Sequence, residues 1–249
     1  NEPLKDRASQ ALEGINALDK LRSKTSYYKV KNLDVLNSPA AEYAPVYFGN
    51  ELYFTSTRGN AKIFEGSGTP FSDIYKVSAK GANVDMATLA PLPALINDPL
   101  RNEGCVTFTP DGKTMVFAKG NSEKKKSGAD VDIYIARQRN NVWMPPVLAA
   151  GVNTPVRNEY DAEAQNFSWD SSPSFSADGR TLYFASNRKG GYGGTDLYSV
   201  QLDSRGRFTR VRNLGPEINT SENEMFPYAA DNGKLYFSSD GHPGVGGLD

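Results

Sequence analysis

Hydrophobic and polar positions along this chain follow the same order four times, most clearly in residues 172–198. There, Phe175 and the apolar run at 182–184 flank an Asp-Gly pair, and a loop with four glycines then leads to residues 196–198, Asp-Leu-Tyr. An Asp-Gly pair between apolar runs is the strongest short-range hairpin signal, because both central positions of the favoured turn need positive φ. The pattern predicts two strands joined by a tight turn, a loop, and the start of a third strand.

The same order returns in three other places. The phenylalanine that closes the second strand of each copy is Phe54, Phe117, Phe184 or Phe237, so the spacings are 63, 67 and 53 residues. The aspartate that opens each third strand is Asp73, Asp132, Asp196 or Asp249. Self-similarity at such a period is typical of propellers and other stacked arrays. We therefore predict an all-β protein, a β-propeller of four-stranded antiparallel blades, of which this chain starts four.

Linkers built around Asn separate the copies. They share an Asn followed by Ser, Thr or Asp and lie at 36–39, 96–99, 152–155 and 218–221. An acidic residue follows each linker: Glu42, Glu103, Glu159 or Glu224. Asn, Ser and Thr suit a crossing loop because their side chains hydrogen-bond to the backbone. The third linker carries an extra stretch, 160–169, and insertions in repeat proteins tend to fall on a functional face, so this stretch is a candidate contact surface.

The N-terminal region has a different period. Leu12, Ile15 and Leu18 belong to an apolar stripe at helical spacing with charged residues opposite, which predicts one helix over residues 3–21. The stripe is expected to dock, either on the β-domain or inside a helical-repeat domain of which this is the last helix. We assign residues 1–26 to this helical segment.

Residues 27–33 alternate apolar and polar positions and closely resemble residues 208–214, which end the third copy. We interpret them as the outermost strand of a closing blade, since a propeller leaves no edge bare when strands from both ends of the chain pair. The propeller is then predicted over 27–249 and is truncated at Asp249, where a third strand should begin. Because the chain starts at Asn1 without a Met, we interpret it as a fragment. The intact ring is expected to have five or six blades.

Composition narrows the function classes. With 249 residues, 38% of them hydrophobic, the chain can bury one substantial core. The formal net charge of −1 and a pI of about 6.0 do not favour nucleic-acid binding by the whole surface. A local basic loop at 122–128 is either a solvated insertion or a contact for an acidic partner. No apolar run reaches the roughly 18 residues of a membrane span. The only cysteine, Cys105, is expected to be a buried apolar residue rather than a reactive thiol.

The Pro-x-Phe, Asp-Gly, Leu-Tyr-Phe, Ser-Asn-Arg and Asp-(Ile/Leu)-Tyr elements of the repeat together resemble the TolB-type, WD-repeat-like propeller family. The Gly-Gly-Tyr-Gly-Gly-Thr-Asp stretch at 190–196 is similar to cell-envelope proteins of Bacteroidota, in which a propeller precedes a carboxypeptidase-regulatory-like domain and an OmpA-type peptidoglycan-binding domain. The resemblance covers about residues 27–249. It implies a periplasmic lipoprotein associated with the outer membrane, with a role in type IX secretion and with peptidoglycan bound through a domain outside this chain.

Residues that could carry chemistry are scattered. The four third-strand aspartates Asp73, Asp132, Asp196 and Asp249 are expected to accept hydrogen bonds from loop backbone, with calcium binding as the alternative. Arg58 and Arg188 are either members of an anion-binding cluster or bound to local carbonyls. His242 is the only histidine, so neither a His-based relay nor a His-rich metal site can be built. We predict no catalytic residue, no metal and no cofactor.

Three loop aromatics, Tyr160, Trp169 and Tyr192, could stack on a sugar ring. The four repeats without a catalytic constellation nevertheless favour a non-enzymatic scaffold that binds envelope or secretion-system proteins through its loops. The alternatives are a propeller that binds a glycan such as peptidoglycan, and the propeller module of a hydrolase.

Overall fold

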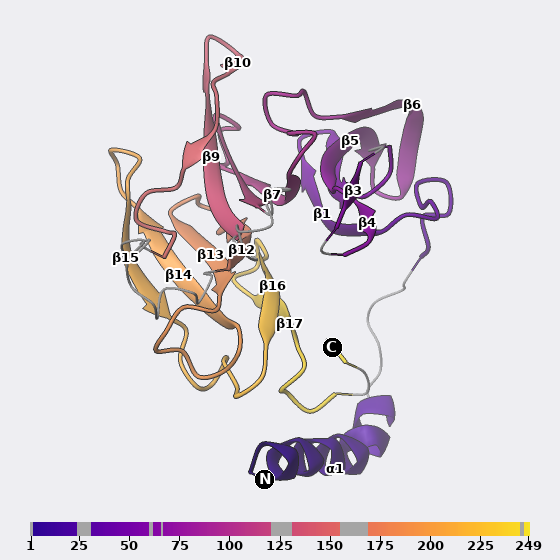
Figure 1. The fold of residues 1–249 in the computed structure, drawn as a ribbon, viewed down its shortest axis with the longest axis vertical. Coiled ribbons are helices and arrows are strands. Elements are labelled where there is room, and N and C mark those ends of the chain that lie inside the picture. Colours follow the sequence, from indigo (N-terminus) through magenta and orange to yellow (C-terminus); the bar gives the residue numbers. More distant parts are fainter. Residues whose placement is uncertain are drawn as a thin grey trace.

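The computed structural model describes residues 2–23, 31–59, 62–65, 67–120, 131–154, 169–244 and 247–249. One helix, α1 (Glu2–Ser23), precedes a series of antiparallel sheets that follow one another in an arc (Figure 1). The first strands of successive sheets contact one another, so the sheets are arranged as blades around a common axis. The predicted all-β architecture with one N-terminal helix is confirmed.

Blades 1 and 3 each have four strands. Blade 1 contains β1 (Glu42–Phe48), β2 (Glu51–Ser56), β5 (Asp73–Lys80) and β6 (Asn83–Pro91), with a small hairpin of β3 (Ile63–Phe64) and β4 (Thr69–Pro70) in the loop after β2. Blade 3 contains β12 (Asp170–Phe175), β13 (Thr181–Ser186), β14 (Asp196–Leu202) and β15 (Phe208–Asn213).

Blades 2 and 4 depart from this scheme at their outer sides. Blade 2 contains β7 (Asn102–Phe108), β8 (Thr114–Gly120) and β9 (Val131–Arg139), and its outer edge is split into β10 (Val142–Trp143) and β11 (Val147–Leu148). Pro145 and Pro146 lie at the break and cannot donate ladder hydrogen bonds. Blade 4 contains β16 (Glu224–Ala229) and β17 (Leu235–Ser239), and Asp249 exchanges both backbone hydrogen bonds with Ser239. The aspartates opening the third strands thus occupy one register, opposite the end of each second strand.

The turns between first and second strands differ from the sequence prediction. Gly112 and Gly179 have φ of 66° and 67°, whereas Asp111 and Asp178 before them do not adopt positive φ. Each aspartate instead accepts the backbone N–H two residues later, Lys113 or Arg180, at 3.0 Å. Because this side-chain bond closes the turn, only the glycine needs the left-handed conformation.

Every first strand contains a bulge at the same position. Four non-glycine residues there have φ of 50–52°, and each lies inside a register shift: Ala44, Cys105, Ser172 and Phe226. A residue in this conformation costs about 1 kcal/mol or more, and a bulge bends and twists its strand. Repetition in all four blades shows that the bend belongs to the architecture, because it lets each first strand turn as it passes its neighbours.

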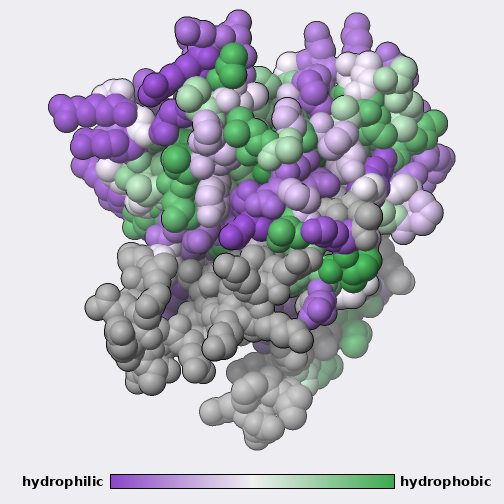
Figure 2. All heavy atoms as spheres, turned by 45° about the horizontal axis from the view of Figure 1, so that its top comes forward, coloured by the Kyte–Doolittle hydropathy of each residue, from purple (hydrophilic) through white to green (hydrophobic). Residues whose placement is uncertain are grey.

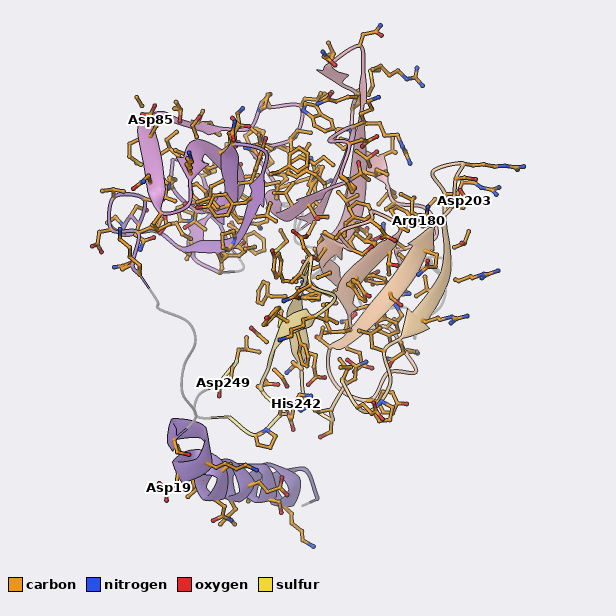
Figure 3. The ribbon with its side chains drawn as sticks, turned by 180° about the vertical axis from the view of Figure 1, so that it is seen from behind. Asp19, Asp85, Arg180, Asp203, His242 and Asp249 are labelled. Atoms are coloured by element: carbon orange, nitrogen blue, oxygen red, sulfur yellow. The ribbon has the colours of Figure 1, made fainter. Side chains whose placement is uncertain are left out.

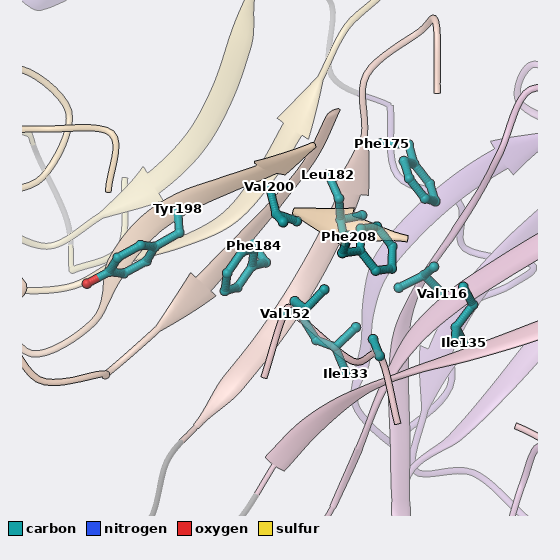
Figure 4. Close-up of a cluster of buried hydrophobic side chains, with 11 residues drawn as sticks. Val116, Ile133, Ile135, Val152, Phe175, Leu182, Phe184, Tyr198, Val200 and Phe208 are labelled. Atoms are coloured by element: carbon teal, nitrogen blue, oxygen red, sulfur yellow. The ribbon is translucent and has the colours of Figure 1, made fainter. Parts of the chain in front are cut away.

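The core lies between the blades. Val116 and Ile133 of blade 2 pack against Phe175, Phe184 and Phe208 of blade 3 (Figure 4). Between blades 1 and 2, a second cluster is built around Phe108, whose ring centroid lies 4.7 Å from that of Phe48, which is stacked on it, and 4.7 Å from that of Tyr53, which is tilted. The Tyr and Phe residues of the repeat therefore pack between sheets. Cys105 is buried, as expected.

The helix α1 agrees with the predicted span, but the apolar stripe is largely exposed: Leu12 is 59% and Ile15 62% exposed, and Leu18 is half-buried. Gly14 of the helix lies close to Gly244 in the loop after β17. Several predictions fall outside the described residues: most of the strand at 27–33, the basic loop at 122–128, Tyr160 and Glu159, and Gly246 before the last aspartate.

Candidate functional site

The linkers between blades, and the loops after the second strands, meet on one side of the molecule, here called the linker face. A carboxylate lies at the first or second position of each first strand, two residues before the bulge: Glu42, Glu103, Asp170 and Glu224. Each accepts the backbone N–H of the residue that follows the linker Asn, at 2.7–3.2 Å: Ser38, Asp98, Thr154 and Thr220. These acids therefore fix the linkers to the blades. In the third copy the acid is Asp170 and not the predicted Glu159, because the inserted stretch separates the linker from its strand.

In blades 1 and 3 an arginine pairs with this acid. The Arg188 guanidinium lies 2.8 Å from Asp170 and 2.8 Å from the carbonyl oxygen of Val152, and 4.9 and 4.8 Å from the ring centroids of Phe184 and Tyr198. Asp170 is fully buried, and the Arg188 side chain is 15% exposed. A buried carboxylate needs such a partner.

Arg58 of blade 1 repeats the arrangement. It bonds Glu42 at 2.8 Å and the carbonyl of Leu36 at 2.6 Å, and it lies over Phe54. Burial raises the pKa of Glu42, but hydrogen bonds from Ser38, Arg58 and Ser56 outweigh burial and leave that pKa below its ordinary value. The structure thus places Arg58 and Arg188 in separate blades, each bound to its own linker. A binding role for them remains a prediction.

Blade 2 has a lysine instead. Lys119 lies 3.0 Å from Oε1 of Glu103 and 3.6 Å from Asp98. Glu103 is 1% exposed, and burial raises its pKa to about 8 although Lys119 acts in the opposite direction. The nearby Asp73 contributes to this rise, and burial raises the pKa of Asp73 itself to about 6. The single ammonium group therefore compensates its acid less completely than a guanidinium does.

In blade 4 the position of the arginine is taken by His242. Its Nε2 lies 2.8 Å from the carbonyl oxygen of Ile218, and its ring meets the edge of Phe237 at a centroid distance of 5.7 Å. The acid of this blade, Glu224, accepts hydrogen bonds from the hydroxyls of Thr220 and Ser239, both at 2.7 Å. The sequence predicted no role for His242, because a single histidine cannot form a relay or a His-rich metal site. The signal that identifies it is its place three residues after the serine that ends the second strand.

The linker asparagines join consecutive blades. Asn97 bonds both the N–H and the C=O of Ile74, at 3.0 Å each, and Asn153 and Asn219 do the same with Ile133 and Leu197. Each asparagine therefore replaces a strand partner for the third strand of the preceding blade.

The glycine-rich loop of blade 3 is held by Asp196. The Asp196 carboxylate accepts the N–H of Tyr192 at 2.7 Å and of Gly193 at 3.0 Å, as well as the Asn213 amide. A Cβ on Gly193 would collide with the carbonyl oxygen of Glu222, so glycine is required there for close approach. The loop presents Tyr192 at 52% exposure.

The remaining predicted site residues belong to different parts of the fold. Trp169 is partly buried against the Cys105 cluster, while Asp132 and Asp249 each open the third strand of another blade. Within the described residues, no group of three or more His, Cys, Asp or Glu side chains could hold a metal ion. The helix α1 lacks the apolar length that crossing a membrane would require.

The opposite side, here called the hairpin face, carries the turns between strands. A recess of about 300 Å³ lies there between the turn at 176–181 of blade 3 and the turn at 229–235 of blade 4. Asp178, Asp231 and Lys234 are among its lining residues, so its walls are partly charged.

No protein family and no curated protein matches the chain. Solved structures do. A thermostable family-43 glycoside hydrolase is 13% identical with a TM-score of 0.51, over 83% of this chain and 69% of that one. An alpha-L-arabinofuranosidase from Lactobacillus brevis is 16% identical with a TM-score of 0.50, over 83% and 68%. The beta-propeller domain of the Trilobed protease from Pyrococcus furiosus is 14% identical with a TM-score of 0.36, over 70% and 43%. At these identities the likeness concerns the fold, which is that of a β-propeller.

Proposed function

We propose that this chain is a non-enzymatic, protein-binding propeller of a bacterial envelope protein. One observation carries the proposal. Arg58 and Arg188, the two arginines that the sequence offers for chemistry, are each bound to the acid at the start of the blade's first strand, to a linker carbonyl and to aromatic rings of the same blade. A frame fixed in this way suits presentation of loops and hairpins to a partner.

The envelope location rests on the sequence resemblance. The repeat and the glycine-rich loop at 190–196 are similar to the propellers of Bacteroidota OmpA-family proteins, and among these to PorE, a periplasmic lipoprotein of the type IX secretion system. The proposal accordingly places the chain in the periplasm beside the outer membrane, in a complex with secretion-system proteins.

Site-specific photo-crosslinking tests this function. A photoreactive residue at Tyr192 on the linker face, or at exposed Arg205 on the hairpin face, should give one saturable crosslinked product with an envelope protein. The same residue at Lys80 of blade 1 serves as a control position. Deletion of the propeller should impair secretion. Absence of any saturable product, or normal secretion after deletion, would refute the proposal.

A second candidate is the propeller module of a hydrolase. The observation that favours it is the pair of acids with raised pKa, Asp73 at about 6 and Glu103 at about 8, because raised carboxyl pKa values are frequent at active sites. Glu103 is 1% exposed and bound to Lys119, which limits it to an indirect role. Turnover of a glycoside or peptide panel that is lost in an Asp73→Asn variant, and retained in Asp111→Asn, would establish this alternative instead.

A further inference from the structure

Exposed arginines gather on the hairpin face of blades 2 and 3. Although the whole chain has a net charge of −1, residues 169–215 contain seven basic and four acidic side chains. Five exposed arginines lie at the ends of neighbouring hairpins: Arg137, Arg139, Arg180, Arg205 and Arg207. Figure 3 shows Arg180 beside Asp203 at this end of blade 3, and Figure 2 shows hydrophilic side chains protruding where hairpins β9–β10 and β14–β15 end. We call these five residues the arginine rim.

Hydrogen bonds to backbone carbonyls bring the members of the arginine rim together. The Arg137 guanidinium donates to the carbonyl of Gly206 at 2.9 Å, which ties the β9–β10 hairpin of blade 2 to the β14–β15 turn of blade 3. The N–H of Leu202 donates to the carbonyl of Arg180 at 2.7 Å, so Arg180 lies next to the same turn. The rim is therefore continuous across two blades.

The two acids within this region, Asp178 and Asp203, compensate the charge of the five rim arginines only in part. Asp178 accepts the Ser176 hydroxyl and the Arg180 N–H, and these bonds hold the pKa of Asp178 below its ordinary value. Asp203 accepts the backbone N–H groups of Arg205 and Arg207 and pairs with the Arg207 guanidinium at 2.9 Å. Among the described residues, the guanidinium groups of Arg139, Arg180 and Arg205 make no hydrogen bond and no close ion pair, and only Arg180 interacts electrostatically with a nearby acid, Asp178. Their donors are therefore available to an external anion.

Apolar side chains stand beside the arginines. Val142 is the cross-strand partner of Arg139, and the N–H of Met144 donates to the carbonyl of Arg137. Val142 is 63% and Met144 38% exposed. Exposed apolar side chains next to arginine are the composition of a protein-binding patch rather than of a solvated charged face.

We propose that the arginine rim, with Val142 and Met144, is the docking surface for an acidic peptide segment of a partner protein that carries an apolar anchor residue. The inference rests on the proposed protein-binding function and names its surface. Arg137 and Arg207 are held in place by Gly206 and Asp203, and fixed planar guanidiniums suit discrete carboxylates. An anionic membrane would meet only the tips of the hairpins, whereas Arg137 and Met144 lie along the side of the β9–β10 hairpin.

The probe that tests this surface is a short fluorescent peptide of Glu and Leu residues, measured by anisotropy at about 0.15 M salt. The parent chain should bind it, and an Arg139→Ser/Arg205→Ser double variant should bind at least about tenfold more weakly. The matched control is Arg212→Ser, which removes an exposed charge from β15 of the same blade. Val211 packs against the core between blades 2 and 3, so its neighbour Arg212 points to the other side of the sheet. That variant should bind within about twofold of the parent.

Several outcomes would overturn the proposal: no binding of the acidic peptide by the parent, an equal loss in Arg212→Ser, or rim-dependent binding of anionic phosphatidylglycerol vesicles without binding of the peptide. Repeating the photo-crosslinking at Tyr192 in the double variant separates this inference from the general function. If the partner still crosslinks with unchanged saturation, the rim is not its docking surface although the scaffold function stands. If neither Tyr192 nor Arg205 gives a crosslinked product in the parent chain, the scaffold function itself fails.

Discussion

Blades 2 and 3 each bury a carboxylate at the same place in the repeat, but they compensate its charge with different cations. In blade 3, Asp170 meets a guanidinium that also binds a linker carbonyl and two aromatic rings. In blade 2, Glu103 meets the ammonium group of Lys119, which it shares with Asp98, and burial raises the pKa of Glu103 to about 8. The hydrogen bond between linker and first strand is therefore the constant element of the repeat, whereas the cation that compensates the acid differs from blade to blade.

The largest effect is expected in blade 3. The Asp170→Asn variant leaves the largely buried guanidinium of Arg188 without its acid, so the free energy of unfolding should fall by about 3 kcal/mol. Urea unfolding measures this loss, with Glu103→Gln as the matched control in blade 2. A loss below about 1 kcal/mol would mean that the two blades are electrostatically equivalent.

Replacement of a linker asparagine should lower the free energy of unfolding by the same amount whichever two blades the linker joins. Asn97 and Asn219 are 7% and 2% exposed and make the same pair of bonds to a third strand. Replacing either by Ala leaves a buried N–H and C=O without partners, and each variant should lose about 2 kcal/mol. The exposed Asn37, at the equivalent place in the first linker, is the control and should lose less than about 0.5 kcal/mol on replacement by Ala. Unequal losses for Asn97 and Asn219 would show that the blades differ in more than their cations.

A smaller, pH-dependent effect is expected for Glu103→Gln. The folded pKa of Glu103, about 8, lies above the ordinary 4.5, so its contribution to stability is fully present below about pH 4.5 and is lost as the pH rises through 8. Gln does not titrate. The variant should therefore be within about 1 kcal/mol of the parent near pH 6 and should gain on the parent between pH 6 and 9. Unfolding curves that run parallel over this range would show that Glu103 is ionised throughout.

The smallest effect concerns Cys105, which lies where the two blades meet. Burial raises the pKa of its thiol to about 11 from 9, so the thiolate fraction is about a hundredfold lower than for an unperturbed thiol. A disulfide reagent at pH 8 should leave the native thiol unmodified and react at once in urea. Rapid modification of the native chain, with stability unchanged, would indicate that the junction of blades 2 and 3 opens readily.

Much of this fold follows from local sequence. The Asp-Gly pairs at 111–112 and 178–179 located two of the hairpins, and the recurring aspartates located the third strands, because both signals act within a few residues. The positive φ at Ala44, Cys105, Ser172 and Phe226 had no local signal, since it arises where first strands meet around the axis. Similarly, 15 residues separate Thr154 from Asp170, whereas three separate Ser38 from Glu42, and this longer spacing concealed the third acid. The arginine rim could not be predicted from the sequence, because its members come from different blades.

A double-mutant cycle of Asp170→Asn and Arg188→Met, measured by urea unfolding, tests most directly whether the acid–arginine pair has a structural role. If these side chains hold blade 3 together, the cycle should give a coupling energy of about 2 kcal/mol. The two single variants and the double variant should still crosslink to the partner through Tyr192 wherever they fold. A coupling energy near zero, together with loss of crosslinking in the Arg188→Met variant, would contradict the account and assign Arg188 to binding.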